Sequence, residues 1–419
     1  MGARHIVVIG GGFAGLNVVR RLARANVRIT LVDKMNHHLF QPLLYQVASA
    51  ALSPADIATS LREILRDQEN VTVIMGDVAR VEKRAKKLLF TCGMELDYDT
   101  LVIAVGARHS YFGNEGWEEH APGLKTIRDA LTIRERILLS FERAERSSDQ
   151  AAIDALLRFV IIGGGPTGVE MAGAIAEIAH QTMFRNFRNI DPERSRITLI
   201  EGSDRLLPAF PPRLSRRAQR DLERLGVEVA VGQIVTDVTS GGVSIGEEFI
   251  PSHNIIWAAG NQASPLLASL DVPLDRQGRV IVERDLTIPG DESIFVIGDA
   301  AHFRDKKGVP LPAIAPAAIQ QGAHVAKSIA KRRRPFTYLD KGSIATIGKH
   351  KAVGYIRKFT FSGALAWLFW GFIHVFYLVG YRNRLSVMVN WVFHYLTGLR
   401  GARLIQRPID AEKRPQREP

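Results

Sequence analysis

Apolar and polar positions near the start of the chain follow a strand–helix–strand order. Residues 5–10, HIVVIG, form a short apolar run that is rich in β-branched residues. Residues 16–25 carry apolar side chains at helical spacing, and residues 27–32, VRITLV, form a second apolar run. Short buried strands that flank an amphipathic helix are typical of a parallel sheet. The pattern therefore predicts a βαβ unit.

A glycine motif lies between this first strand and the helix. Gly10, Gly12 and Gly15 form G-x-G-x-x-G, and Asp33 ends the second strand about 20 residues later. Glycines at this spacing allow a tight turn and the close approach of a pyrophosphate, which the helix N-terminus attracts. Asp33 is expected to accept hydrogen bonds from a ribose diol. This context predicts a dinucleotide site, and the alternative is a glycine-rich loop in another kind of α/β protein.

The same order recurs in the middle of the chain. Strand-like residues 158–162 lead into a second G-x-G-x-x-G at residues 163–168, and strand-like residues 196–200 end at Glu201. The gap to this acid is longer than usual, so residues 178–195 must extend the helix or add a loop. An acid at this position favours a free ribose 2′-hydroxyl, because it repels a 2′-phosphate. Two motifs therefore predict two dinucleotides, the second of them NAD rather than NADP.

Three further apolar segments complete the pattern. Residues 99–107 and 252–260 are strand-like and end in small residues, one after each glycine motif. This repetition suggests two homologous dinucleotide-binding domains. Residues 293–300 form another buried strand, which ends at Asp299. An acid at the carboxyl end of a parallel strand can contact a ligand, although taken alone a cap or turn aspartate is the commoner case.

Composition limits the classes of protein that remain. The chain has 419 residues, of which 46% are hydrophobic and 23% are charged, with a net charge of +12. This balance is typical of a globular protein of two or three domains. The single cysteine, Cys92, excludes an internal disulfide. The sequence shows no secretory signal, since glycines interrupt the only apolar run near its start.

Three stretches, together with the two glycine motifs, indicate a family. These stretches are Asn36–Ala48, Leu311–Gly322 and the tail around Ala366-Trp367, His374 and Gly380–Arg384. With the IFVIGDA segment they resemble type II NADH dehydrogenases, which are single-subunit NADH:quinone oxidoreductases of the two-dinucleotide-binding-domain flavoproteins. The resemblance covers roughly residues 5–400. It implies oxidation of NADH through FAD, with electrons passed to a membrane quinone of the respiratory chain and no proton pumping.

The resemblance also implies site residues. Those for FAD are Gly10, Gly12, Phe13, Ala14, Gly15, Asp33, Lys34, His38, Gln41, Val78, Ala104, Gly106, Gly298, Asp299 and Ala315. Those for NADH are Gly163, Gly165, Pro166, Thr167, Gly168, Glu170, Glu201 and Gly260. Those for the quinone are Gln41, Gln46, Pro316 and Gln320. No metal site is expected.

Glu170 and Gln320 are the expected catalytic residues. Glu170 follows the second glycine motif, in the first turn of the predicted helix, and is expected to help deliver protons to the quinone. A dipole-favoured acid with no catalytic role is the alternative. One position departs from the family, since Pro316 stands where a glutamine is common beside the flavin. The departure puts a side-chain contact from this position to the quinone in doubt.

The cysteine count separates the chain from related flavoproteins. Disulfide reductases of this superfamily use a redox cysteine pair beside the flavin, and sulfide-oxidising relatives also use cysteines. Cys92 stands alone in a predicted strand-and-turn segment. Electrons are therefore expected to pass from the flavin to the acceptor without a thiol relay.

The C-terminal region predicts contact with a membrane or another protein. Residues 361–379 contain no formal charge, and in residues 385–397 Ser386, Asn390, His394 and Thr397 form one polar stripe on an apolar helix. Such a helix can lie in a membrane interface or cover a dimer interface. The resemblance favours a peripheral membrane protein at the cytoplasmic face of a bacterial inner or plasma membrane. The expected partners are NADH, a quinone, this membrane surface and a second copy of the chain, with no nucleic acid.

The predicted fold is α/β, with two Rossmann-like domains, a C-terminal hairpin and membrane-associating helices. The FAD domain is expected at residues 1–115 and 272–335, the NADH domain at 116–271, the hairpin and helices at 336–400, and a charged tail at 401–419. Within these regions, residues 336–357 are expected to form the hairpin, and residues 410–419 are expected to be disordered. Two other functions stay open. One is a soluble NADH-dependent reductase that serves a small redox protein, and the other is a redox sensor that binds NADH with little turnover.

Overall fold

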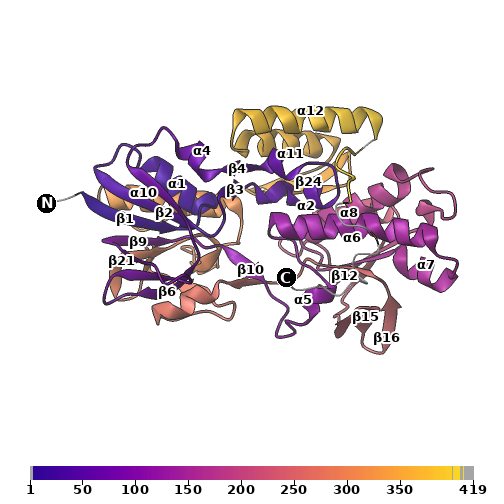
Figure 1. Ribbon diagram of the computed structural model, residues 1–419, viewed down its shortest axis with the longest axis horizontal. Helices are drawn as coiled ribbons and strands as arrows, with labels where there is room; N and C mark the ends of the chain where they lie inside the picture. The colour runs from indigo at the N-terminus through magenta and orange to yellow at the C-terminus, as the bar shows by residue number, and fades with distance from the viewer. Residues whose placement is uncertain (1–2, 399, 406–408, 410–419) are drawn as a thin grey trace, which may run out of the picture. The chain divides into compact units, whose positions relative to one another are not determined.

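The computed structural model describes residues 3–398, 400–405 and 409, which form two compact units (Figure 1). The first unit combines three segments of the chain, Met1–Leu39, Ala58–Arg108 and Asn261–Lys341. The second unit combines Phe40–Ile57, His109–Gly260 and Gly342–Pro419. Each unit contains one glycine motif. The predicted fold class, with a split first domain and the second domain inserted into it, is confirmed.

The first unit is built on a parallel sheet. The strand order is β20-β21-β9-β1-β2-β5, and every neighbouring pair is parallel except β20 with β21. The strands and helices of this unit are β1 (Arg4–Ile9), α1 (Phe13–Arg21), β2 (Val27–Asp33), β3 (His37–Leu39), β4 (Ala58–Ser60), α4 (Leu61–Leu65), β5 (Val71–Met75), β6 (Val78–Glu82), β7 (Lys87–Phe90), β8 (Glu95–Asp97), β9 (Thr100–Ile103), β10 (Ala107–His109), β18 (Asn261–Ala263), β19 (Val280–Ile281), β20 (Thr287–Ile288), β21 (Asp291–Val296), β22 (Ala301–His302) and α10 (Ala315–Ala330).

Both faces of this sheet are covered, which explains the continuous apolar run in β1. Ile6 and Val8 pack on one face, where α1 and α10 lie side by side (Figure 1). Val7 and Ile9 pack on the other face, against the antiparallel sheet of β6, β7 and β8. A strand that is buried on both faces needs apolar residues at every position rather than at alternate ones.

The second unit contains a smaller parallel sheet with the strand order β13-β12-β11-β17. Its strands and helices are α2 (Leu44–Ala48), α3 (Pro54–Ile57), α5 (Trp117–His120), α6 (Ile127–Arg146), α7 (Gln150–Leu156), β11 (Arg158–Ile162), α8 (Pro166–Glu177), β12 (Arg196–Glu201), α9 (Pro212–Glu223), β13 (Val227–Val231), β14 (Asp237–Thr239), β15 (Gly242–Ile245), β16 (Glu248–Pro251), β17 (Asn254–Trp257), β23 (Ser343–Ile347), β24 (Lys351–Ile356), β25 (Phe359–Gly363), α11 (Ala364–Tyr377) and α12 (Tyr381–Thr397). After α8, one turn of π-helix at Ile178–Thr182 and an irregular segment account for the long gap before Glu201.

The C-terminal part extends the predicted hairpin to three strands. The hairpin was expected at residues 336–357, whereas β23 and β24 occupy Ser343–Ile356 and β25 pairs with β24 as a third strand. Helices α11 and α12 follow side by side, drawn in yellow in Figure 1. Within the described ranges, none of the helices combines the length and the hydropathy that crossing a bilayer requires. The expected disorder of residues 410–419 falls outside the described residues.

Candidate functional site

The first glycine motif forms a loop that leaves a helix N-terminus open. Gly10 has a φ of +102°, and a side chain there would overlap the backbone oxygen of Ala104. Helix α1 starts after Gly12 with no side-chain cap and no acid in its first turn. A Cβ atom added to Gly12 would meet no atom within 4 Å, so space remains beside the loop. Uncapped N–H groups next to open space fit a pyrophosphate.

The second glycine motif repeats this geometry. Gly163 has a φ of +109°, and helix α8 starts after Gly165 with no side-chain cap and no acid in its first turn. Gly163 N–H donates to the Ile200 carbonyl at 2.8 Å, just as Gly10 N–H donates to the Val32 carbonyl at 2.7 Å. The duplication inferred from the sequence therefore extends to the hydrogen bonds of the two loops.

The two acids that end β2 and β12 also play matching roles. Asp33 accepts from Gly11 N–H at 2.6 Å and from Met35 N–H at 2.7 Å. Glu201 accepts from the N–H groups of Gly164 at 2.5 Å and Ser203 at 2.7 Å. A carboxylate has about four lone-pair sites, so each acid retains capacity for a ribose hydroxyl. Each carboxylate therefore fixes its glycine loop and can also accept a hydrogen bond from a nucleotide.

His38 supplies a second observation that fits a cofactor in the first unit. Its ring is 2% exposed, and Nδ1 lies 2.9 Å from the Gly11 carbonyl, while Nε2 is buried with no partner among the described residues. Burial lowers the pKa of His38, so the ring is neutral. Because Nδ1 donates to a carbonyl, Nε2 is an acceptor. A buried acceptor without a donor fits a hydroxyl group of a bound FAD.

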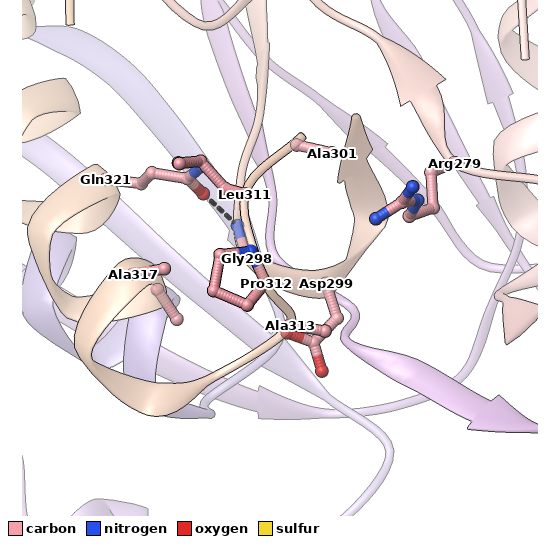
Figure 2. Close-up of a pocket in the computed structure, with 10 residues that line it drawn as sticks. Arg279, Gly298, Asp299, Ala301, Leu311, Pro312, Ala313, Ala317 and Gln321 are labelled. Carbon is pink, nitrogen blue, oxygen red and sulfur yellow. Dashed lines mark hydrogen bonds between the residues drawn. The ribbon is translucent and has the colours of Figure 1, made fainter. Parts of the chain in front are cut away.

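The segment around Gly298 closes a pocket in the same unit (Figure 2). Gly298 N–H donates at 2.6 Å to the Gln321 side chain, which is 2% exposed and comes from α10. Asp299 and Arg279 line the pocket. Gln321 and Arg279 were not predicted as site residues, although Gln321 lies in the Leu311–Gly322 stretch that resembles the family. The pocket places Asp299 where a cofactor can reach it.

The residues predicted for FAD and those predicted for NADH fall, with one exception, in different units. All the residues expected for FAD lie in the first unit except Gln41, which lies in the second and donates to the Lys125 carbonyl at 3.1 Å. All those expected for NADH lie in the second unit. Lys34 is exposed, whereas Val78 and Ala104 are buried.

The residues expected for the quinone fall in both units. Pro316 and Gln320 belong to α10 of the first unit. Pro316 occupies the first turn of that helix, where a missing N–H costs little. The Gln320 amide pairs with both backbone groups of Leu339, at 2.9 and 3.0 Å. Gln46 belongs to the second unit and lines a larger pocket there.

This second pocket brings together residues from distant parts of the chain. Its walls come from α2, α8, β23, α11 and α12, and its lining includes Tyr45, Gln46, Glu170, Glu177, Thr346, Trp367, Trp370, Trp391 and Arg400. Three tryptophans make much of the wall apolar, while two acids, one amide and several hydroxyl groups give it polar contacts. Apolar pockets with a few convergent polar groups are typical of sites for small organic ligands.

Glu170 lines this pocket, and its pKa depends on the pocket's surroundings. It is the fifth residue of α8, so it lies beyond the first turn in which it was predicted. The residue as a whole is half-buried, and Thr346 N–H donates to its carboxyl group at 3.5 Å. Surrounding protein raises the pKa of Glu170 to about 8, because burial disfavours the charged form. The side chain is therefore largely protonated at neutral pH and can donate a proton.

Arg400 and Glu177 form an ion pair at the pocket wall. Arg400 donates to Glu177 at 3.0 Å and to the backbone carbonyls of Ser49 at 2.6 Å and Ala174 at 3.3 Å. Burial raises the pKa of Glu177 and lowers that of Arg400, and each partner opposes the shift of the other. Neither residue was predicted, because no local pattern links positions so far apart in the sequence.

Comparisons with known proteins agree with this geometry. Residues 4–322 match the model of the pyridine nucleotide-disulphide oxidoreductase family, and residues 341–400 match the NDH2 C-terminal domain. The chain is 44% identical to type II NADH:quinone oxidoreductase NdhA of Mycobacterium tuberculosis, over 96% of this chain and 89% of the relative. It is 30% identical to the type II NADH:quinone oxidoreductase of Staphylococcus haemolyticus, over 84% of this chain and 90% of that relative.

Solved structures share the fold. The structure of NDH2 from Plasmodium falciparum in complex with NADH superposes with a TM-score of 0.88 at 21% identity, covering 95% of this chain and 99% of that one. The sulfide:quinone oxidoreductase of Aquifex aeolicus has a TM-score of 0.73 at 20% identity, covering 92% of both chains. At these identities the likeness concerns the fold.

Proposed function

The chain belongs to the type II NADH:quinone oxidoreductase family, and from this premise we propose that it transfers electrons from NADH through FAD to a membrane quinone, without pumping protons. The observation that carries the proposal is Glu170, an acid whose pKa is raised by burial and which lines a tryptophan-rich pocket of a unit that also holds a complete dinucleotide loop. Reduction of a quinone consumes two protons as well as two electrons, and such an acid supplies protons away from bulk water.

FAD is assigned to the first glycine motif. The residues that would hold it are the Gly10–Gly15 loop, Asp33, His38 and Asp299, which the first unit brings together. When bound, FAD supplies the redox chemistry, because it accepts a hydride from a nicotinamide and gives up electrons to a quinone. The proposed domains are residues 1–115 with 272–335 for FAD and 116–271 for NADH.

NADH is assigned to the second motif, with Glu201 as the residue that selects it. The Glu201 carboxylate is held by two backbone N–H groups at the end of β12. A ribose diol can donate to such a carboxylate, whereas a 2′-phosphate would be repelled by it. This supports a preference for NADH over NADPH.

The quinone is assigned to the pocket that Glu170 lines. Gln46 reaches this pocket, and it is the predicted quinone residue that the contacts of the second unit support best. The side chains of Gln41 and Gln320 already bond to the backbone, and Pro316 offers no donor. Roles for these three residues toward the quinone remain proposals that rest on the family resemblance.

The outward faces of α11 and α12 support attachment to a membrane. In α12 two residues of the polar stripe turn inward, since Ser386 and Asn390 donate to Asp56 of α3 at 2.6 and 3.3 Å. The opposite faces carry exposed apolar side chains, namely Leu365, Leu368, Phe369, Phe372 and Phe376 of α11 and Leu385, Met388, Val389, Val392, Phe393 and Leu396 of α12. An unpartnered apolar face on two adjacent helices is suited to a lipid interface.

We therefore propose a peripheral protein at the cytoplasmic face of a bacterial inner or plasma membrane. The basic residues near these helices would meet anionic headgroups, each worth about 1 kcal/mol close to the surface. A homodimer is a separate proposal that rests on the family resemblance. A site open to lipid would also give a hydrophobic quinone access to the pocket.

A charged double variant is expected to weaken this attachment. Leu368→Glu with Leu396→Glu places two carboxylates on side chains that are 59% and 77% exposed. Binding to phosphatidylglycerol-containing vesicles should fall by at least about tenfold, because a charge is costly at an apolar interface. Sedimentation with vesicles measures the effect, and Ile234→Glu, at a 71% exposed position outside the helices, is the control. Equal binding by the double variant and the control would contradict a membrane role for these faces.

Anaerobic absorbance of the FAD-loaded protein tests the function as a whole. Stoichiometric NADH should bleach the flavin band, and a soluble quinone analogue should restore it within the turnover time. Restoration by a small iron–sulfur protein but not by the quinone would favour the soluble reductase. Bleaching without steady-state NADH oxidation by either acceptor would favour the redox sensor.

A further inference from the structure

A chain of hydrogen bonds runs from the C-terminal helix α12 to the wall of the Glu170 pocket. Trp391 Nε1–H donates to the Oε1 atom of Gln46 at 2.7 Å. An indole nitrogen can only donate, so it determines which end of the Gln46 amide is the oxygen. The amide nitrogen of Gln46 therefore points the other way, and it donates to the hydroxyl oxygen of Tyr45 at 3.0 Å.

The next bond joins two buried hydroxyl groups. The Tyr45 hydroxyl lies 3.0 Å from the Thr346 hydroxyl, and Tyr45 is 8% exposed. Tyr45 already accepts from Gln46, and among the described residues the Thr346 hydroxyl is the partner to which it can donate. Either hydroxyl can donate to the other, and whichever donates, the proton of the other hydroxyl has no acceptor among the described residues. We take the arrangement in which Tyr45 donates, because it leaves this proton on Thr346, whose backbone N–H contacts Glu170.

The last group in this series of hydrogen bonds is the Thr346 hydroxyl. Once Thr346 accepts from Tyr45, its own hydroxyl proton has no acceptor among the described residues. Thr346 is 2% exposed, yet it lines the pocket together with Glu170. Its backbone N–H donates to the Glu170 carboxyl group at 3.5 Å, so the two residues are neighbours. A buried donor without an acceptor is rare and calls for a ligand.

We propose that the Thr346 hydroxyl donates a hydrogen bond to a carbonyl oxygen of the quinone, and that Trp391, Gln46 and Tyr45 are positioning residues that set its direction. This inference rests on the proposed function. A quinone carbonyl only accepts, so it matches the hydroxyl proton that this arrangement leaves without an acceptor. Thr346 binds and orients the oxygen, while Glu170 beside it supplies a transferable proton. Because the first donor belongs to α12, the direction also depends on the docking of that helix.

Variants of Thr346 test the proposal directly. Thr346→Val removes the hydroxyl at nearly constant volume and should raise the KM for a soluble quinone about tenfold, the equivalent of about 1.4 kcal/mol. Thr346→Ser retains the hydroxyl and should restore the KM to within about twofold of the original. Bleaching of the flavin band by NADH should proceed at an unchanged rate in both variants.

A variant of Trp391, the first donor in the series of hydrogen bonds, tests whether this series positions Thr346. Trp391→Phe should raise the quinone KM by about threefold, because the Gln46 amide is no longer held in one orientation. Combined with Thr346→Val, it should add nothing, since the hydroxyl that it positions is absent. Trp117→Phe, which also removes an indole N–H bond, to Asp237 at 3.3 Å, is the control and should leave the quinone KM unchanged.

Three outcomes overturn the inference. They are an unchanged quinone KM in Thr346→Val, a Thr346→Ser variant that behaves like Thr346→Val, and additive effects of Trp391→Phe and Thr346→Val. Failure of the proposed function looks different, because the unmodified protein would then bleach with NADH and not be reoxidised by any quinone.

Discussion

Glu170→Gln is expected to slow reoxidation of the reduced protein by quinone by about 100-fold, while NADH still bleaches the flavin band at the original rate. Glutamine keeps the size and polarity of the side chain but has no acidic proton to give. The carboxyl group lines the quinone pocket, and its raised pKa of about 8 keeps it protonated at neutral pH. Stopped-flow absorbance separates the two half-reactions.

The pH dependence of the same half-reaction has a definite sign. Since the pKa of Glu170 is raised to about 8, quinone reduction should be steady below pH 7 and fall as the pH rises through 8. Glu170→Gln should lack this fall. The charged and titratable groups that share the pocket are Glu177 of the same helix, Tyr45 of α2, Lys349 after β23, and His394, Tyr395 and Arg400 of the C-terminal segment.

The stability of the folded protein should also fall as the pH rises. The protonated form of Glu170 is stabilised in the folded protein, and its ordinary pKa is 4.5. Its contribution is therefore complete below pH 4.5 and is lost as the pH rises to about 8. Glu170→Gln should raise the Tm relative to the original more at pH 8 than at pH 5.

Glu247→Gln, an exposed glutamate of the same unit, is the control for both measurements. It should match the unmodified protein in quinone reduction and in Tm at both pH values. A Glu170→Gln variant that reduces quinone at the original rate would remove Glu170 from proton delivery.

Arg400→Ala is expected to destabilise the second unit by about 3–5 kcal/mol. The guanidinium group is 4% exposed and bonds to Glu177 and to the carbonyls of Ser49 and Ala174. Its removal leaves a buried carboxylate without its ion partner. All five tryptophans belong to the second unit, so their fluorescence during urea unfolding reports on this unit selectively.

Two further variants make this result specific. Arg213→Ala, at an exposed position of α9, should change the free energy of unfolding by less than about 0.5 kcal/mol. Arg400→Met combined with Glu177→Leu should recover most of the lost stability, because no unpaired charge stays buried. A loss below about 1 kcal/mol in Arg400→Ala would show that the pair does not anchor the C-terminal segment.

Local patterns were enough to predict the two glycine loops and the polar stripe of α12. The glycine motifs depend on the backbone angles of adjacent residues, as Gly10 and Gly163 show with their positive φ values. The polar stripe of α12 follows from helical spacing, and Ser386 and Asn390 do turn toward the protein. Both patterns involve residues that are close together in the sequence, so they can be recognised without the tertiary structure.

The pocket beside Glu170 forms only when segments that are distant in the sequence pack together. Tyr45 and Thr346 are 301 positions apart, and Arg400 and Ser49 are 351 apart, yet each pair is hydrogen-bonded. No periodicity connects such residues, because their contact depends on how α2, α8, β23 and the C-terminal helices pack together. The raised pKa of Glu170 has the same origin, since burial by distant segments, rather than the neighbouring sequence, disfavours its charge.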